Sequence, residues 1–164
     1  MSETTSNHGR VIVTKGTDHC AVTLGPTDVC LVPGPPHPEP FPNIVKSDKL
    51  AKGATTTAFI ANQPVCTSIG ELGPPSDPAH PGVLGGVVSG TYRFEAKATS
   101  YSSDVFFEGN AAVRVFDTTT QNHANTTGMV LPSWLALMLA GLDAECLAAA
   151  AAAAKMFVAP PPAP

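Results

Sequence analysis

The sequence predicts one mainly β domain of short strands, followed by an α-helix and a proline-rich tail. The chain has 164 residues, with 17 prolines and 14 glycines that follow no period. These residues alternate with short runs of Val, Ile, Thr and Phe, which is typical of short strands joined by fixed turns. In residues 91–97, Tyr92, Phe94 and Ala96 alternate with charged side chains, the pattern of a half-buried strand. A chain of this length suffices for one modest domain.

Composition narrows the classes of partner. Charged residues make up 13% of the chain and the net charge is -4, so nothing in the electrostatics favours nucleic acid or anionic lipid as a partner. Residues 1–10 are polar and lack the apolar core of a secretory signal. The four cysteines are therefore expected to be thiols or metal ligands before disulfides.

Most of the domain is expected to be strand and turn. Residues 1–9 are predicted to be a loose tail. Glu108-Gly109-Asn110 is predicted to be a hairpin loop, and residues 73–86 and 117–128 to be long polar or proline-rich turns. The predicted strands are Val11–Val13, Cys20–Leu24, Asp28–Val32, Thr55–Ala61, Val65–Ile69, Val87–Gly90, Thr91–Ala98, Val105–Phe107 and Ala112–Phe116.

The segment from Pro33 to Asn43 contains so many prolines that neither a helix nor a central strand is expected there. It could be a flexible proline linker or a stiff ribbon on the surface. We favour the ribbon because Phe41 and Ile44 supply apolar anchors.

The pattern changes at Pro132. Pro132-Ser133-Trp134 is expected to open a helix that continues through leucines and an alanine run to Lys155, since alanine has the highest helix propensity. A membrane-spanning helix is the competing interpretation, but Asp143 and Glu145 lie in its middle, where charge is costly in lipid. We expect a helical extension over 129–158 that packs against protein, and a stiff proline-rich tail over 159–164.

A set of imidazole and thiol side chains predicts a structural zinc site. Cys30, His37, His80 and His123 each lie in or beside a turn, and these are the ligand types of a closed tetrahedral zinc site. Cys66 is the alternative fourth ligand. The spacing suggests a metal that joins distant loops rather than a catalytic centre.

Four blocks of sequence occur in a characteristic order between residues 10 and 128. The blocks are 28–33 with 40–44, 76–82 with 86–90, 103–110, and 113–117 with 119–125. Their order and spacing resemble the PAAR-like family, the small caps on the spikes of contractile injection systems. The Pro-Ala-Ala-Arg motif of the better-known group is present only as Ala111-Ala112-Val113-Arg114, so the chain is similar to the divergent branch.

The resemblance implies a small conical domain of β-hairpins. It implies that the broad base sits on a trimeric spike protein of the valine-glycine-repeat type, one copy per trimer, and that zinc lies near the apex. It also implies that the cap sharpens the spike, can carry effector cargo, and contacts a membrane only transiently. A pointed apex has little interior, so a metal cross-link would stiffen it without needing volume.

We therefore expect a structural protein rather than an enzyme, made in the bacterial cytoplasm and delivered outside the cell at the particle's tip. The alternatives are a zinc-dependent hydrolase and a metal-free β adhesion or binding module. Neither a His-Glu-x-x-His nor a Gly-x-Ser-x-Gly motif is present, which argues against the hydrolase. Because the resemblance ends before the helix, removal of residues 130–164 is expected to leave the domain folded.

Overall fold

The structure is a computed structural model that describes residues 6–24, 27–74 and 81–140. It confirms the predicted mainly β fold with one short helix near the C-terminal side. The strands are β1 (Ser6–Asn7), β2 (Arg10–Val11), β3 (His19–Thr23), β4 (Asp28–Val32), β5 (His37–Phe41), β6 (Ile44–Lys46), β7 (Leu50–Ile60), β8 (Gln63–Leu72), β9 (Ala96–Ala98), β10 (Phe106–Phe107), β11 (Asn110–Ala111), β12 (Thr118–Gln121) and β13 (Thr126–Pro132). The 3₁₀ turn η1 (Ser47–Lys49) joins β6 to β7, and α1 (Ser133–Ala140) follows β13.

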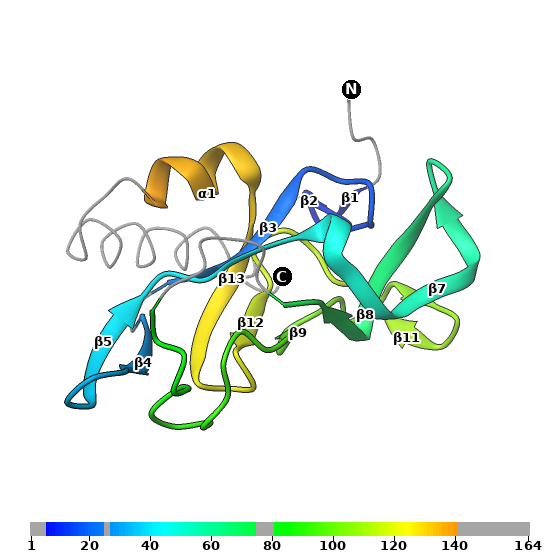
Figure 1. Cartoon of the computed structure of the whole chain (residues 1–164). Helices are drawn as coiled ribbons and strands as arrows, with labels where there is room; N and C mark the ends of the chain where they lie inside the picture. Colours follow the sequence, from blue (N-terminus) through cyan, green and yellow to red (C-terminus); the bar gives the residue numbers. More distant parts are fainter. Residues whose placement is uncertain (1–5, 25–26, 75–80, 141–164) are drawn as a thin grey trace.

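Seven strands form one antiparallel sheet in the order β6–β3–β13–β12–β9–β8–β7. Figure 1 shows this sheet curling from β3 and β13 toward β7 at one end of the molecule. β13 lies between β3 and β12, so that Val130 pairs with Ala21 and Met129 pairs with Thr118. The main apolar core packs on this sheet and comprises Val13, Ala21, Val45, Leu50, Cys66, Leu72, Ala96, Val113 and Val130.

β4 and β5 form a separate two-stranded hairpin, which Figure 1 shows at the end of the molecule opposite β7 and β11. In β5, Pro38 and Pro40 lie opposite Leu31 and Val29 of β4. Proline has no N–H to donate, so a strand with two prolines is suited to an edge and not to the middle of a sheet. The prediction of an extended surface ribbon over this segment is confirmed, and its stiffness stays a prediction.

Several predictions of secondary structure are wrong. The predicted strand Thr91–Ala98 is reduced to β9, because Arg93 has a positive φ of 56° and Phe94, expected on the buried face, is 50% exposed. The predicted strand Ala112–Phe116 makes only isolated bridges, at Ala112 and Arg114.

Residues 117–128 were expected to be turns, yet most of them belong to β12 and β13. Threonine is β-branched and packs well on a pleated surface, so the Thr-rich runs extend once neighbouring strands are present. Residues 87–90 were expected to be a strand but form a turn, closed by the N–H of Gly90 donating to the carbonyl of Gly86 at 2.8 Å.

The strands extend a few residues past the range 10–128 at both ends. Ser6 and Asn7, in the predicted loose tail, pair with β2. At the other end the sheet continues to Pro132, beyond the expected boundary at residue 128, and α1 begins at Ser133, beside the predicted start.

The short helix α1 packs back onto the sheet. Its Ala136 and Leu139 are buried against a second apolar cluster that includes Cys20 and Leu131. The helix predicted over 141–158 and the tail over 159–164 lie outside the described residues. Within the described part of the chain, no helix is long and apolar enough to cross a membrane.

Candidate functional site

Three hairpins with the same geometry form the most distinctive feature of the molecule. In each, two residue pairs enclose a two-residue turn: Ser6–Val11, Phe59–Pro64 and Phe106–Ala111. The turn residues are His8 and Gly9, Ala61 and Asn62, and Glu108 and Gly109, and all six have φ between 49° and 79°. Positive φ at both central positions defines the type I′ turn, whose twist matches that of paired strands. The predicted hairpin loop at residues 108–110 is thereby confirmed.

The segments that leave these hairpins meet in a closed cycle of hydrogen bonds. The N–H of Val13 donates to the carbonyl of Val113 at 2.9 Å, the N–H of Val113 to that of Cys66 at 3.0 Å, and the N–H of Cys66 to that of Val13 at 2.9 Å. These residues occupy the same position after their respective turns. The cycle thus relates the three units by an approximate three-fold rotation, and we call this assembly the hairpin ring.

Isolated β-bridges repeat the same rotation one residue to either side. Ile12 bridges Arg114, Thr14 bridges Val65, and Thr67 bridges Ala112. Each bridge joins the residue before the cycle in one unit to the residue after it in another. Because all three units obey one rule, the arrangement cannot be an accident of a single contact.

Apolar side chains pack on both sides of the hairpin ring. Val13, Cys66 and Val113 belong to the main core. Ile12, Val65 and Ala112 form a smaller cluster with Ile60, Val105 and Phe107 on the hairpins. The ring is therefore a rigid part of the interior whose hairpins extend to the surface.

Two polar contacts tie a hairpin turn to the segment that leads into another hairpin. His8 Nε2 lies 2.7 Å from Asp104 Oδ2. Glu108 Oε1 accepts hydrogen bonds from the backbone N–H groups of Thr56, Thr57 and Ala58 at 2.7, 2.6 and 3.1 Å, and from the Thr57 hydroxyl at 2.8 Å. These donors lower the pKa of Glu108 to about 2, the hydrogen bonds from Thr57 contributing most.

The hairpins also present large apolar side chains to solvent. Phe59 is 53% exposed and Phe106 is 57% exposed. They occupy equivalent positions, each being the first residue of its hairpin unit. The approximate three-fold rotation relates these two aromatic rings. Exposed apolar side chains are typical of surfaces that bind a partner, so this face is a candidate docking surface.

Cys30, the first predicted zinc ligand, is buried in β4 with no exposed surface. The Nδ2 of Asn122 lies 3.8 Å from its sulfur. Burial, followed by the nearby Asp28 carboxylate, raises the pKa of the thiol to about 12. Both effects favour the neutral thiol.

His37, the second predicted ligand, lies at the exposed start of β5. Its Nδ1 is 3.0 Å from the carbonyl oxygen of Pro35 and its Nε2 is 2.9 Å from Glu39 Oε1. These contacts, the Pro35 carbonyl first, raise the pKa of the imidazole. Both ring nitrogens already have partners within the hairpin.

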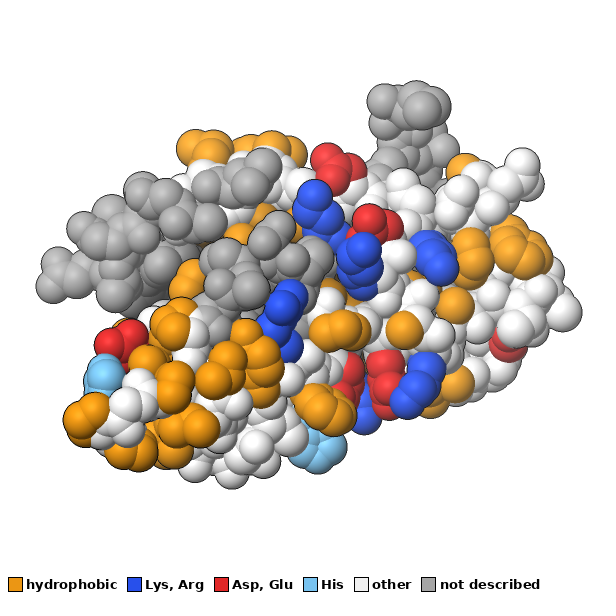
Figure 2. All heavy atoms as spheres, in the orientation of Figure 1, with side chains coloured by type: hydrophobic (Ala, Val, Ile, Leu, Met, Phe, Trp, Pro, Cys, Tyr) orange, Lys and Arg blue, Asp and Glu red, His pale blue; other side chains and the backbone are white. Residues whose placement is uncertain are grey.

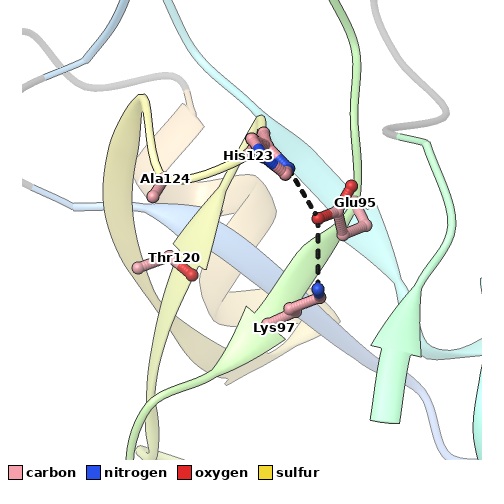
Figure 3. A pocket seen from close by; sticks show the side chains of 5 residues that line it. All are labelled: Glu95, Lys97, Thr120, His123 and Ala124. Carbon is pink, nitrogen blue, oxygen red and sulfur yellow. Dashed lines mark hydrogen bonds and ion pairs between the residues drawn. The ribbon is translucent and has the colours of Figure 1, made fainter. Parts of the chain in front are cut away.

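His123, the third predicted ligand, lies on the β12–β13 turn beside a shallow pocket (Figure 3). Its Nδ1 is 3.1 Å from Glu95 Oε1, which is also 3.4 Å from Lys97 Nζ. The ring meets Phe94 edge-on, with centroids 5.8 Å apart. His123 is thus directed toward a carboxylate and an aromatic ring on the segment leading into β9.

This turn is held in an unusual conformation by buried polar side chains. Asn122, His123 and Ala124 all have positive φ. The Nδ2 groups of Asn122 and Asn125 donate to the carboxylate of Asp28, which is fully buried. These hydrogen bonds offset the backbone strain and determine where His123 lies.

The remaining predicted ligands do not complete a site. Cys66 lies in the hairpin ring, 3% exposed, and burial raises the pKa of its thiol to about 12. His80 lies outside the described residues. Among the residues that the structure describes, no three His, Cys, Asp or Glu side chains are placed to hold a metal ion. The described ligands therefore do not fit a zinc ion by themselves, and the zinc site stays a prediction.

The fold and the hairpin ring define a small curled β domain with an approximately three-fold face. Comparison with protein families matches the toxin PAAR-like domain to residues 21–128, more than half of the chain. The chain belongs to this family, which confirms the resemblance inferred from the sequence. Comparisons with curated proteins and with solved structures found no match.

Sequence reasoning missed the hairpin ring, although a signal is present. Gly9 and Gly109 each lie four positions before a valine, Val13 and Val113, and that valine ends a run of three small or β-branched residues. The third unit replaces these residues with Asn62 and Cys66. A search for turn residues at one fixed distance from a buried valine or cysteine would have found the repeat.

Proposed function

We propose that this chain is a structural spike-tip protein that caps a trimeric spike of a contractile injection system and helps it pierce a target membrane. The observation that supports the proposal is the approximate three-fold rotation of the hairpin ring. Membership of the PAAR-like family supports a role on a spike and a structural rather than enzymatic one. In this proposal the particle carries the chain out of the bacterial cytoplasm, with effector cargo as a further partner.

A single chain with three similar units solves a problem of symmetry. A trimeric spike ends in three identical surfaces around its axis. An asymmetric cap would satisfy one of them, whereas a cap with three related hairpins offers each surface a similar contact. The cap therefore binds as one copy per trimer and converts a three-fold shaft into one tapering, conical point.

The docking contacts proposed are apolar side chains and strand edges of the hairpins. β1, β10 and β11 are two-residue strands outside the main sheet, and in this proposal their outer edges pair with strands of the spike. Phe59 and Phe106 supply apolar area next to these edges.

Mixing the chain with a purified trimeric spike protein of the valine-glycine-repeat type tests the proposal. We expect a complex of one chain per trimer by size-exclusion chromatography with light scattering. The double variant Phe59→Asp/Phe106→Asp should lose the complex while staying folded by circular dichroism. Val87→Asp/Val88→Asp, on exposed residues of a different segment, is the matched control and should bind normally. No complex, or three chains per trimer, would overturn the proposal.

Structural zinc is a separate proposal, and the spike-tip role does not depend on it. It requires His80 and His123 to lie close enough to Cys30 to share one ion. Replacement of both histidines by alanine should then lower the metal content and the melting temperature of purified protein. Elemental analysis that finds equal metal in the wild type and the variant would refute these ligands. A readily exchanged metal with hydrolytic activity would instead support the hydrolase alternative.

A further inference from the structure

One loop exposes apolar side chains at the end of the molecule opposite the β7 and β11 hairpins. Val83, Leu84, Val87 and Val88 are 51, 49, 55 and 79% exposed. They lie beside β4, and Figure 2 shows hydrophobic side chains gathered where Figure 1 places β4 and β5. We call residues 83–90 with these four side chains the apolar loop.

The apolar loop is held firmly against β4. The N–H of Leu31 donates to the carbonyl of Gly85 at 2.9 Å, and the N–H of Leu84 donates to that of Leu31 at 3.2 Å. The N–H of Val87 donates to the carbonyl of Val29 at 2.9 Å. The loop thus runs along β4, with Gly86 in an isolated antiparallel bridge to Cys30, and these hydrogen bonds fix its backbone.

Every backbone N–H of the apolar loop has an acceptor within the molecule. Six of them donate to main-chain carbonyls of Pro81, Leu31, Gly82, Thr91, Val29 and Gly86. The other two, from Val88 and Ser89, donate to Asn125 Oδ1 at 2.8 and 3.0 Å. A surface loop in water has no need for such complete pairing, whereas a loop that enters lipid must satisfy its polar groups internally.

Charge is also scarce at this end. Residues 81–92 contain no Asp, Glu, Lys or Arg, and residues 27–41 contain only Asp28 and Glu39. Asp28 is fully buried, and Glu39 faces His37 on the hairpin. Contact with hydrocarbon therefore would not require the desolvation of an unpaired charge.

We propose that the apolar loop is a membrane-contacting surface, which inserts Val83, Leu84, Val87 and Val88 into the boundary between headgroups and acyl chains of a lipid bilayer. A protein partner is the weaker explanation, because the loop offers no N–H to a pairing strand. Residues 83–90 contain no Lys or Arg, so the loop suits an uncharged or zwitterionic surface and its binding is insensitive to salt. This membrane contact deepens the proposed function. It rests on that function only in requiring that the end of the molecule with the apolar loop faces the target membrane.

Flotation of the full chain with phosphatidylcholine vesicles tests the inference. We expect the wild type to float with the vesicles at both low and high salt. Val87→Asp/Val88→Asp should reduce the bound fraction by roughly tenfold or more, because two exposed valines lose their burial in lipid and two charges are added. Phe59→Asp/Phe106→Asp is the matched control and should float like the wild type.

A second variant guards against an effect of charge on folding. Val87→Ser/Val88→Ser keeps the loop neutral and should also float less than the wild type, with an unchanged melting temperature. Wild-type protein that stays at the bottom of the gradient, or both valine variants floating normally, would overturn the inference. Binding to the spike with no flotation would overturn it too, while leaving the spike-tip role intact. Flotation of a chain that does not bind the spike would support the membrane contact and overturn the spike-tip role.

Discussion

Glu108 joins the β10–β11 turn to the segment of β7 around Thr57. Its carboxylate accepts hydrogen bonds from several backbone N–H groups at an irregular stretch of β7. These N–H groups would otherwise face solvent. A side chain from one hairpin thus holds the backbone that leads into another. The contact is local in space but distant along the chain.

The lowered pKa of Glu108 predicts a pH dependence of stability. Its folded pKa of about 2 is below the ordinary 4.5, so the ionised form stabilises the fold. This contribution is complete above about pH 4.5 and is lost as the pH falls toward about 2. Glu108→Gln should lower the melting temperature at pH 7 by a few degrees and flatten its dependence on pH in that window.

Thermal melts of wild type and variant between pH 2 and pH 7 check the Glu108 prediction. Asp48→Asn is the matched control, because Asp48 is exposed on η1 and should leave the profile unchanged. A Glu108→Gln profile that stays parallel to the wild type across this range would contradict the role of the carboxylate.

At the scale of secondary-structure elements, the position of Cys66 in the hairpin ring indicates its role. The residue type alone does not. Val13 and Val113 occupy the two positions related to it by the pseudo-rotation. All three side chains are buried in one cluster. Cys66 therefore acts as a small apolar side chain in the core, as buried cysteines commonly do.

Substitution of Cys66 checks this role directly. Cys66→Val should leave the melting temperature equal or higher, because the ring already accommodates valine at both equivalent positions. Cys66→Ser should destabilise the protein by about 1–3 kcal/mol, because it buries a hydroxyl in an apolar cluster. Unchanged stability of Cys66→Ser, or loss of bound metal in Cys66→Val, would contradict a purely apolar role.

For the whole molecule, β13 decides where the domain ends. Leu131 pairs with Cys20 and is 1% exposed, and Val130 is 2% exposed in the main core. Removal of residues 130–164 would take these side chains out of the centre of the sheet. The structure therefore argues against the expectation that this truncation leaves the domain folded.

Two truncations separate the contribution of β13 from that of residues 141–164. A chain ending at Ala140 keeps β13 and α1 and should remain soluble and cooperative in urea unfolding. A chain ending at Met129 should be unfolded or aggregated, because it loses several buried apolar side chains at about 1.5–3 kcal/mol each. A cooperative unfolding transition of the shorter chain would show that β13 is dispensable beyond Met129.

Much of the architecture followed from local patterns. β-branched runs and proline positions predicted the mainly β class, the edge ribbon of β5 and the hairpin at Glu108. The period-two alternation of residues 91–97 was misleading, since only β9 is a strand there and Phe94 is exposed. The four blocks predicted the family that the comparison found. The prediction of turns at residues 117–128 was wrong because polar threonines form strands only when neighbouring strands surround them.

The sequence by itself determined which segments are extended, which must turn, and where proline confines a strand to an edge, because these depend on the dihedral preferences of single residues. Only the tertiary structure decided that three separated hairpins close one cycle of hydrogen bonds. Only the tertiary structure placed Cys30 and Cys66 in the interior. It also provided an acceptor within the molecule for every N–H of the apolar loop. These features depend on contacts between residues far apart in the chain, which no local propensity encodes.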